Sequence, residues 1–123
     1  MKRLGLVLAG VLALGGCASA SADTPIDVAD QVTRAIYSDD LNGTVAHFDN
    51  ALREQVKTED VDRLSQVMHD LGSYRKLTAL YADNLDRRYD YQATFDRGTM
   101  LVQLRFDPDG RVAAYRVSPT QQR

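Results

Sequence analysis

The sequence predicts an α+β domain in which helices come first and pack on one face of a four-stranded antiparallel sheet. Apolar residues recur at three- and four-residue spacing up to Gly72, which is typical of amphipathic helices. After Gly72 they alternate with polar residues, which is typical of strands with one buried face. Short turn signals separate the alternating segments, and such short connections favour antiparallel neighbours.

The first half predicts two helical elements and one ambiguous segment. Thr24 followed by Pro25 is typical of an N-cap and a first helical residue, and the helix should run over residues 25–37. A shorter element follows the polar stop at residues 38–40, and residues 49–57 are compatible with a loop or a helical turn. The apolar positions that carry this pattern are Ile26, Ala29, Val32, Ile36, Leu41, Val45, Phe48, Leu52 and Val56.

A clearer helix is predicted from Thr58, which we expect to cap it. Glu59 and Asp60 fall in the first turn, where negative charge suits the positive end of the helix dipole. Gly72 suits the residue just past the helix end. The expected buried stripe consists of Val61, Leu64, Met68 and Leu71.

Four strands are predicted in the second half. Turn signals lie at residues 82–84, 96–98 and 107–110, and in the last of these proline presets one φ angle while glycine accepts a positive one. The fourth strand should cover residues 112–117, and residues 119–123 form a flexible polar tail. The residues expected to share a buried side are Leu77, Ala79 and Tyr81, then Tyr89, Tyr91, Ala93 and Phe95, then Met100, Val102, Leu104 and Phe106.

The N-terminus has the pattern of an exported protein. Lys2 and Arg3 precede an apolar run of about 11 residues, which is shorter than the ~20 that a membrane-spanning helix needs. The run is therefore predicted to be a cleavable signal. The residues Leu14-Gly15-Gly16-Cys17 resemble the lipobox of bacterial lipoproteins, in which small residues precede a cysteine that is acylated and becomes the first mature residue.

We expect this arrangement to hold the protein in the cell envelope. The membrane partner would be reached through acyl chains, such as palmitate, on Cys17, and two or more chains anchor durably. Plain secretion with cleavage near Asp23 is the alternative. In a Gram-negative bacterium, Ala18 after the cysteine favours the periplasmic face of the outer membrane. The predicted division is 1–16 signal peptide, 17–25 lipidated tether, 26–118 α+β domain and 119–123 tail.

Three segments carry a resemblance to a known superfamily. Residues 46–53, 71–74 and 106–112 are similar to an uncharacterised domain of secreted bacterial proteins in the nuclear-transport-factor-two-like and cystatin-like superfamily. The resemblance covers about residues 27–118. It implies a cone-like fold, in which a curved sheet and helices enclose a pocket. Members of this superfamily include isomerases, dehydratases and small-ligand binders, so the resemblance leaves the function open.

The composition argues against several classes of function. The chain has 15 basic and 17 acidic residues, so it lacks the positive surface that nucleic acids require. Cys17 is the only cysteine, which excludes an internal disulfide. The two histidines lack the spacing of metal ligands, and we predict no metal and no cofactor.

The candidate site is a pocket lined by one histidine and several tyrosines. An enzyme would need a base and a polarising donor that converge in an apolar cavity, and no such cluster is evident. We therefore favour a non-catalytic envelope lipoprotein that binds a small apolar ligand or a protein partner. The alternatives are an isomerase- or hydrolase-like enzyme and an inhibitor or immunity-type binder of a periplasmic protein. The candidate lining residues, each of which could instead serve packing, are His47, Tyr74, Tyr81, Tyr89 and Tyr91.

Lipidation at Cys17 has a direct test. We expect mass spectrometry of the membrane-extracted protein to find an N-terminal Cys17 with acyl chains, because the lipid would hold the chain at the membrane. A Cys17→Ser variant should lose the modification and leave the membrane fraction. An unmodified mature terminus near Asp23 in the parent protein would contradict the lipoprotein interpretation.

Overall fold

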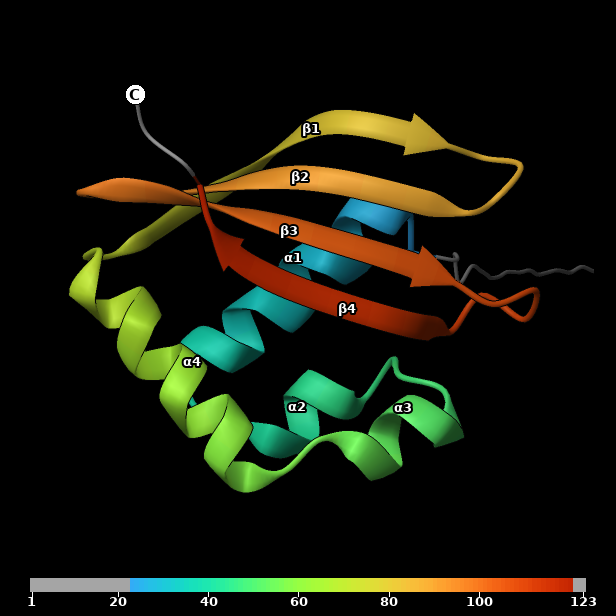
Figure 1. Cartoon of the computed structure of the whole chain (residues 1–123), viewed down its shortest axis with the longest axis horizontal. Coiled ribbons are helices and arrows are strands. Elements are labelled where there is room, and N and C mark those ends of the chain that lie inside the picture. The colour runs from blue at the N-terminus through green and yellow to red at the C-terminus, as the bar shows by residue number, and fades with distance from the viewer. Residues whose placement is uncertain (1–22, 121–123) are drawn as a thin grey trace, which may run out of the picture.

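The computed structural model describes residues 23–120. Within them four helices precede a four-stranded sheet, which confirms the predicted α+β class (Figure 1). The predicted signal peptide and Cys17 lie outside the described residues. The elements are α1 (Pro25–Tyr37), α2 (Leu41–Val45), α3 (Asn50–Gln55), α4 (Thr58–Asp70), β1 (Tyr74–Asp83), β2 (Arg88–Phe95), β3 (Gly98–Phe106) and β4 (Val112–Pro119).

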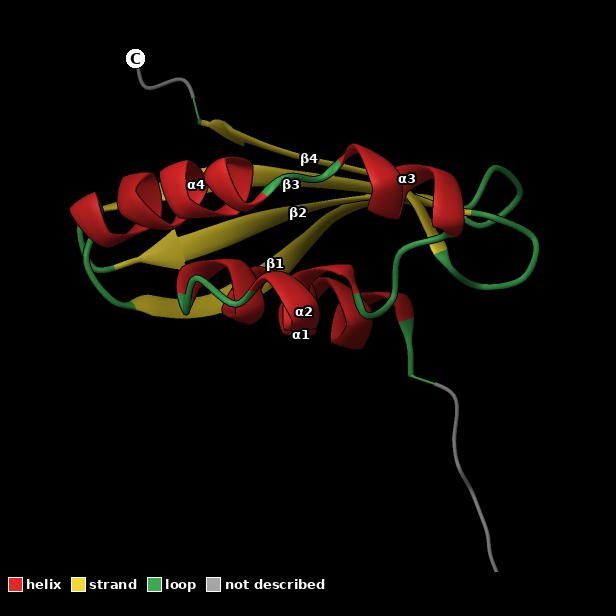
Figure 2. Cartoon of the chain, turned by 90° about the horizontal axis from the view of Figure 1, so that it is seen from below, coloured by secondary structure: helices red, strands yellow, loops and turns green. Residues whose placement is uncertain are grey.

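The sheet has the order β1-β2-β3-β4, and every neighbouring pair is antiparallel. The helices lie on one face, here called the inner face, and leave the outer face open (Figure 2). The two middle strands turn alternate side chains toward the helices, as predicted. The core residues of these strands are Tyr89, Tyr91, Ala93, Phe95, Met100, Val102, Leu104 and Phe106.

The edge strand β1 departs from the predicted alternation. A bulge between Ala79 and Tyr81 adds Leu80, so Tyr81 pairs with Asp90, which faces outward on β2. An extra residue reverses the face on which the following side chain lies. Tyr81 is 54% exposed and Ala79 is exposed too, so the expectation that both lie on a buried side is wrong.

Side-chain caps define where the helices begin. Thr24 caps α1 as predicted: its Oγ1 accepts the Asp27 N–H at 3.3 Å, and the Asp27 carboxylate accepts the Thr24 N–H at 3.3 Å. Thr58 is the first residue of α4 and not its cap, because the N-cap is Lys57. The Asp60 carboxylate accepts the Lys57 N–H at 3.1 Å and so satisfies this helix end from within its first turn.

The second edge strand, β4, is longer and less regular than predicted. It extends to Pro119, so the predicted tail of residues 119–123 begins inside the strand. Ala113 is an extra residue just after Val112. This bulge turns Tyr115, which pairs with a core position of β3, toward the inner face.

Gly72 joins the helices to the sheet in a conformation that a side chain would disturb. Its φ is +93°, and a Cβ there would lie 2.6 Å from the Asp96 Cβ. The Asp96 carboxylate accepts the Ser73 N–H at 3.0 Å and the Arg75 Nε–H at 2.7 Å. The Ser73 N–H and then the Arg75 guanidinium lower the pKa of this carboxyl. These contacts set the direction in which β1 leaves α4.

Two alanine substitutions separate backbone strain from steric contact. Gly110 also has a positive φ, +87°, but no atom lies within 4 Å of its Cβ position. We expect Gly110→Ala to lower the free energy of unfolding by about 1 kcal/mol and Gly72→Ala by about 2–4 kcal/mol, because only the latter meets Asp96. Urea unfolding measures both, and equal losses would contradict the close approach of Asp96.

Candidate ligand-binding site

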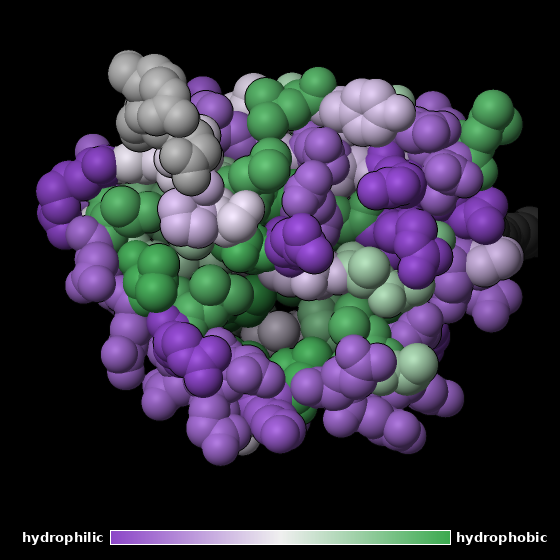
Figure 3. Space-filling view, in the orientation of Figure 1, coloured by the Kyte–Doolittle hydropathy of each residue, from purple (hydrophilic) through white to green (hydrophobic). Residues whose placement is uncertain are grey.

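A recess of about 140 Å³ opens between the edge strand β4 and the helices. In the space-filling view it corresponds to the hollow at the centre of the face, between the sheet and the helices (Figure 3). All four helices or the loops between them contribute to its wall. The lining residues are Ile36, Thr44, Phe48, Leu52, Val56, Asp60, Val61, Leu64 and Tyr115.

The apolar wall follows from the inward stripes of the helices. Val61 and Leu64 are three residues apart on α4 and therefore lie on one side of it. Leu52 is held in place because the Asp49 carboxylate accepts its N–H at 2.9 Å and caps α3. The ambiguous segment of the sequence thus forms a real helix, and its one large apolar side chain, Leu52, faces the recess.

Tyr115 forms the strand side of the recess. Its Oη lies 2.9 Å from Oγ1 of Thr33, and Thr33 donates to the Ala29 carbonyl at 2.8 Å. The phenol is therefore the donor to Thr33, a fully buried residue. The Tyr115 ring packs against Phe48 with a centroid distance of 6.1 Å. Burial raises the pKa of the Tyr115 phenol, so this group stays neutral at physiological pH.

The other polar side chains of the recess are already hydrogen-bonded. Thr44, which is buried, donates to the Asp40 carbonyl at 2.7 Å. Asp60 is exposed; its carboxylate accepts the Lys57 N–H and lies 3.7 Å from the Arg63 guanidinium. The recess therefore offers a bound molecule mainly apolar contacts.

Neither histidine lines the recess. The His47 Nε2 lies 2.7 Å from the Gln31 side-chain oxygen, and the His47 carbonyl accepts the Val112 N–H at 2.8 Å. His69 stacks on Tyr37 with a centroid distance of 4.0 Å, and its Nε2 lies 2.8 Å from the Tyr37 carbonyl oxygen. Both histidines connect elements of the fold.

Three of the candidate tyrosines lie on β1 and β2, away from the recess. Tyr89 and Tyr91 are buried side by side with a centroid distance of 6.5 Å, and the Tyr89 hydroxyl donates to Asn84 at 2.8 Å. Burial raises the pKa of Tyr91 to about 12. Tyr81 is exposed on the outer face. The sheet brings Tyr89 and Tyr91 together in the core.

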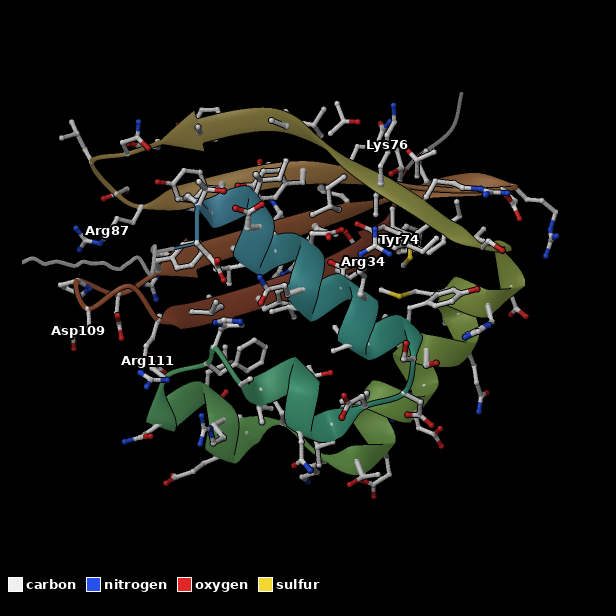
Figure 4. The ribbon with its side chains drawn as sticks, turned by 180° about the vertical axis from the view of Figure 1, so that it is seen from behind. Arg34, Tyr74, Lys76, Arg87, Asp109 and Arg111 are labelled. Atoms are coloured by element: carbon white, nitrogen blue, oxygen red, sulfur yellow. The ribbon has the colours of Figure 1, made fainter. Side chains whose placement is uncertain are left out.

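Tyr74 belongs to a separate niche of about 240 Å³ between α1 and β1, where it lies beside Arg34 (Figure 4). Its hydroxyl donates to the Asp30 carboxylate at 2.6 Å. Arg34 donates to the same carboxylate at 2.9 Å, and its guanidinium lies 5.0 Å from the Tyr74 ring centre. Burial, and then the bond to Asp30, raises the pKa of Tyr74. Since Asp30 neutralises Arg34, this cluster docks α1 on β1.

The comparisons with known proteins add no information about the site. Neither the family models, nor the curated proteins, nor the solved structures contain a match to this chain. In the part of the chain that the structure describes, no three His, Cys, Asp or Glu residues are grouped so that they could hold a metal ion. No helix there is long and apolar enough to cross a membrane.

None of the five residues that the sequence suggests as pocket-lining lies in the recess, and Tyr115 is not among the residues that it suggests. The apolar members from α3 and α4 lie on the stripes that helical periodicity predicts. Strict alternation from the inward-facing Val112 would instead turn Tyr115 outward. The bulge at Ala113 reverses the side of the sheet on which Tyr115 lies, and an alternating apolar pattern does not reveal a bulge.

The partly buried phenol of Tyr115 predicts a loss of stability in alkali. Its pKa is raised in the folded protein, so above about pH 10 only the unfolded chain releases the proton. Stability should therefore fall as the pH rises, by up to about 1.4 kcal/mol per pH unit from this group.

Tyr115→Phe tests this by urea unfolding at pH 9 and pH 11. The variant should be less stable at pH 9 by about 1 kcal/mol, because a hydrogen bond is lost, and the gap should narrow or reverse at pH 11. Tyr81→Phe changes a position that is 54% exposed. Its free energy of unfolding should differ from that of the parent by the same amount at pH 9 and pH 11. A constant gap for Tyr115→Phe would contradict the raised pKa of this phenol.

Proposed function

We propose that the protein is an envelope lipoprotein whose domain binds a small apolar group in the recess without transforming it. The group would be a free ligand or an apolar side chain of a protein partner. The observation that carries this proposal is the wall of the recess, where six aliphatic or aromatic side chains from the helical half face Tyr115. Concave, mostly apolar sites with few polar groups are the usual form of small-ligand sites.

The size of the recess indicates the size of the group. An engineered apolar cavity of roughly 150 Å³ stays dry and takes up benzene. The recess is about 140 Å³, so a single ring or a short branched chain matches it. The apolar lining favours an apolar group, because water would find few hydrogen-bond partners there.

The surroundings support binding over catalysis. A general base must reach the substrate proton, and both histidines are engaged elsewhere. Asp60 is the acidic group at the recess, but it is solvent-exposed and caps α4. Tyr115 is a neutral donor that already serves Thr33. An isomerase- or hydrolase-like reaction would therefore lack a base that can reach a substrate bound in the recess.

Ligand uptake can be measured by thermal unfolding with benzene. We use the Cys17→Ser chain, because its missing lipid cannot compete for the site. Benzene near saturation should raise its unfolding midpoint by about 2–4 °C, since a ligand that binds the folded state stabilises it.

A filled recess provides the control for benzene uptake. Val56 is half-buried at the recess, so Val56→Phe should fill it and abolish the benzene shift. Val67 is 38% exposed and lies on α4 outside the recess, so Val67→Phe should keep the shift. An absent shift in the parent chain, or an unchanged shift in Val56→Phe, would defeat the proposal.

A further inference from the structure

Three arginines gather on the outer face of the sheet. Arg88, Arg105 and Arg116 come from the adjacent strands β2, β3 and β4, and all three are exposed. Arg88 pairs directly with Arg105, and Arg116 pairs with Gln103, two residues from Arg105. Side chains at opposite and diagonal positions of one sheet face are neighbours. The three guanidinium groups therefore form one cluster, here called the arginine cluster.

The arginine cluster carries a net positive charge. On the same sheet face Asp83 pairs with Arg88 and Asp90 lies diagonal to Arg105, so two carboxylates face three guanidinium groups. Among residues 23–120 the ion pairs involve Arg34, Arg63 and Arg75, and none involves a member of the cluster. Like charges opposite each other on a sheet destabilise it. An anion bound between them would relieve this repulsion, and guanidinium forks match the geometry of carboxylates.

The arginine cluster adjoins the apolar recess. Its side chains line a hollow of about 510 Å³ that extends over the edge of β4 to α3. Leu52 and Tyr115 line both this hollow and the recess, so the two spaces meet at these residues. Asp90 is the one carboxylate among the lining residues of the hollow, and three arginines outnumber it. Figure 3 shows strongly hydrophilic side chains over the sheet, on the same face as the central hollow.

We propose that the recess and the arginine cluster together bind a small amphipathic carboxylate. Its apolar body would enter the recess, and its carboxylate would lie across the edge of β4 on the arginine cluster. A body of about six carbons matches the recess, by analogy with benzene in a cavity of similar volume. This inference rests on the proposed function, because it names the class of ligand for the same recess.

Calorimetry with hexanoate and hexanol tests the inference on the Cys17→Ser chain. Both probes have six carbon atoms, and only hexanoate carries a charge. We expect hexanoate to bind at least about fivefold tighter than hexanol, because charge-assisted hydrogen bonds to arginine add to the apolar contact. Raising the salt concentration should weaken the binding of hexanoate and leave the binding of hexanol unchanged.

Substitutions test whether the arginine cluster causes the difference in affinity between hexanoate and hexanol. Arg105→Gln combined with Arg116→Gln should reduce hexanoate affinity to that of hexanol and leave hexanol binding unchanged. Lys76→Gln is the matched control, because Lys76 is an exposed cation on the distant edge strand β1 (Figure 4). It should leave both affinities as they are. Thermal unfolding verifies that each variant is folded, as expected for exposed positions.

The outcomes separate this inference from the proposed function. Equal binding of hexanoate and hexanol in the parent chain would overturn the anion site and leave the recess as a site for neutral groups. An equal loss of hexanoate affinity in Lys76→Gln and in the double variant would also overturn it, because the effect would then be one of overall charge. Binding of neither probe would overturn both the recess and the anion site.

Discussion

The recess depends on one short stretch of backbone pairing between the helical half and the sheet. Val112 at the start of β4 donates to the His47 carbonyl at 2.8 Å, and its own carbonyl accepts the Asp49 N–H at 2.9 Å. Phe48, between these two residues, is 2% exposed and packs against Tyr115. Because this bridge ties the chain before α3 to the sheet edge, α3 is held below β4 and the recess has a fixed outer wall. Apart from this bridge, α3 is held by Leu52, which packs against the core, and by Arg53, which donates to the Val45 carbonyl.

The opposite end of the helical layer is fixed by a different device. Gly72 turns the chain from α4 into β1, and Asp96 binds both Ser73 and Arg75 just after the turn. Met68, one turn before this point, is fully buried against the sheet. With both ends fixed, α4 lies below β4 at a separation that the sheet and the bridge determine together. A recess between two such constraints can persist without a ligand, because its walls cannot collapse freely.

Periodicity predicts the elements of this fold, whereas bulges limit what it says about individual faces. The stripe of α4 and the alternation of β2 and β3 follow directly from apolar spacing, and both agree with the structure. Tyr81 and Tyr115 lie beyond bulges on the two edge strands, and their sides are reversed. Edge strands have a partner on one side only, so an extra residue there disturbs less pairing. The sequence pattern is therefore least informative at the edge where the recess forms.

The bulge at Ala113 also links the two kinds of surface that meet on β4. With regular alternation from Val112, Arg116 would point into the helical layer, and burying an unpaired guanidinium costs several kcal/mol even after relaxation. One extra residue sends Arg116 outward and Tyr115 inward at the same time. The irregularity that keeps a charge out of the core is thus the one that gives the recess its neutral phenol. It also leaves a cation on the other face of the same edge strand, next to Arg105. An apolar recess and a cationic face could not adjoin at this edge if β4 were regular.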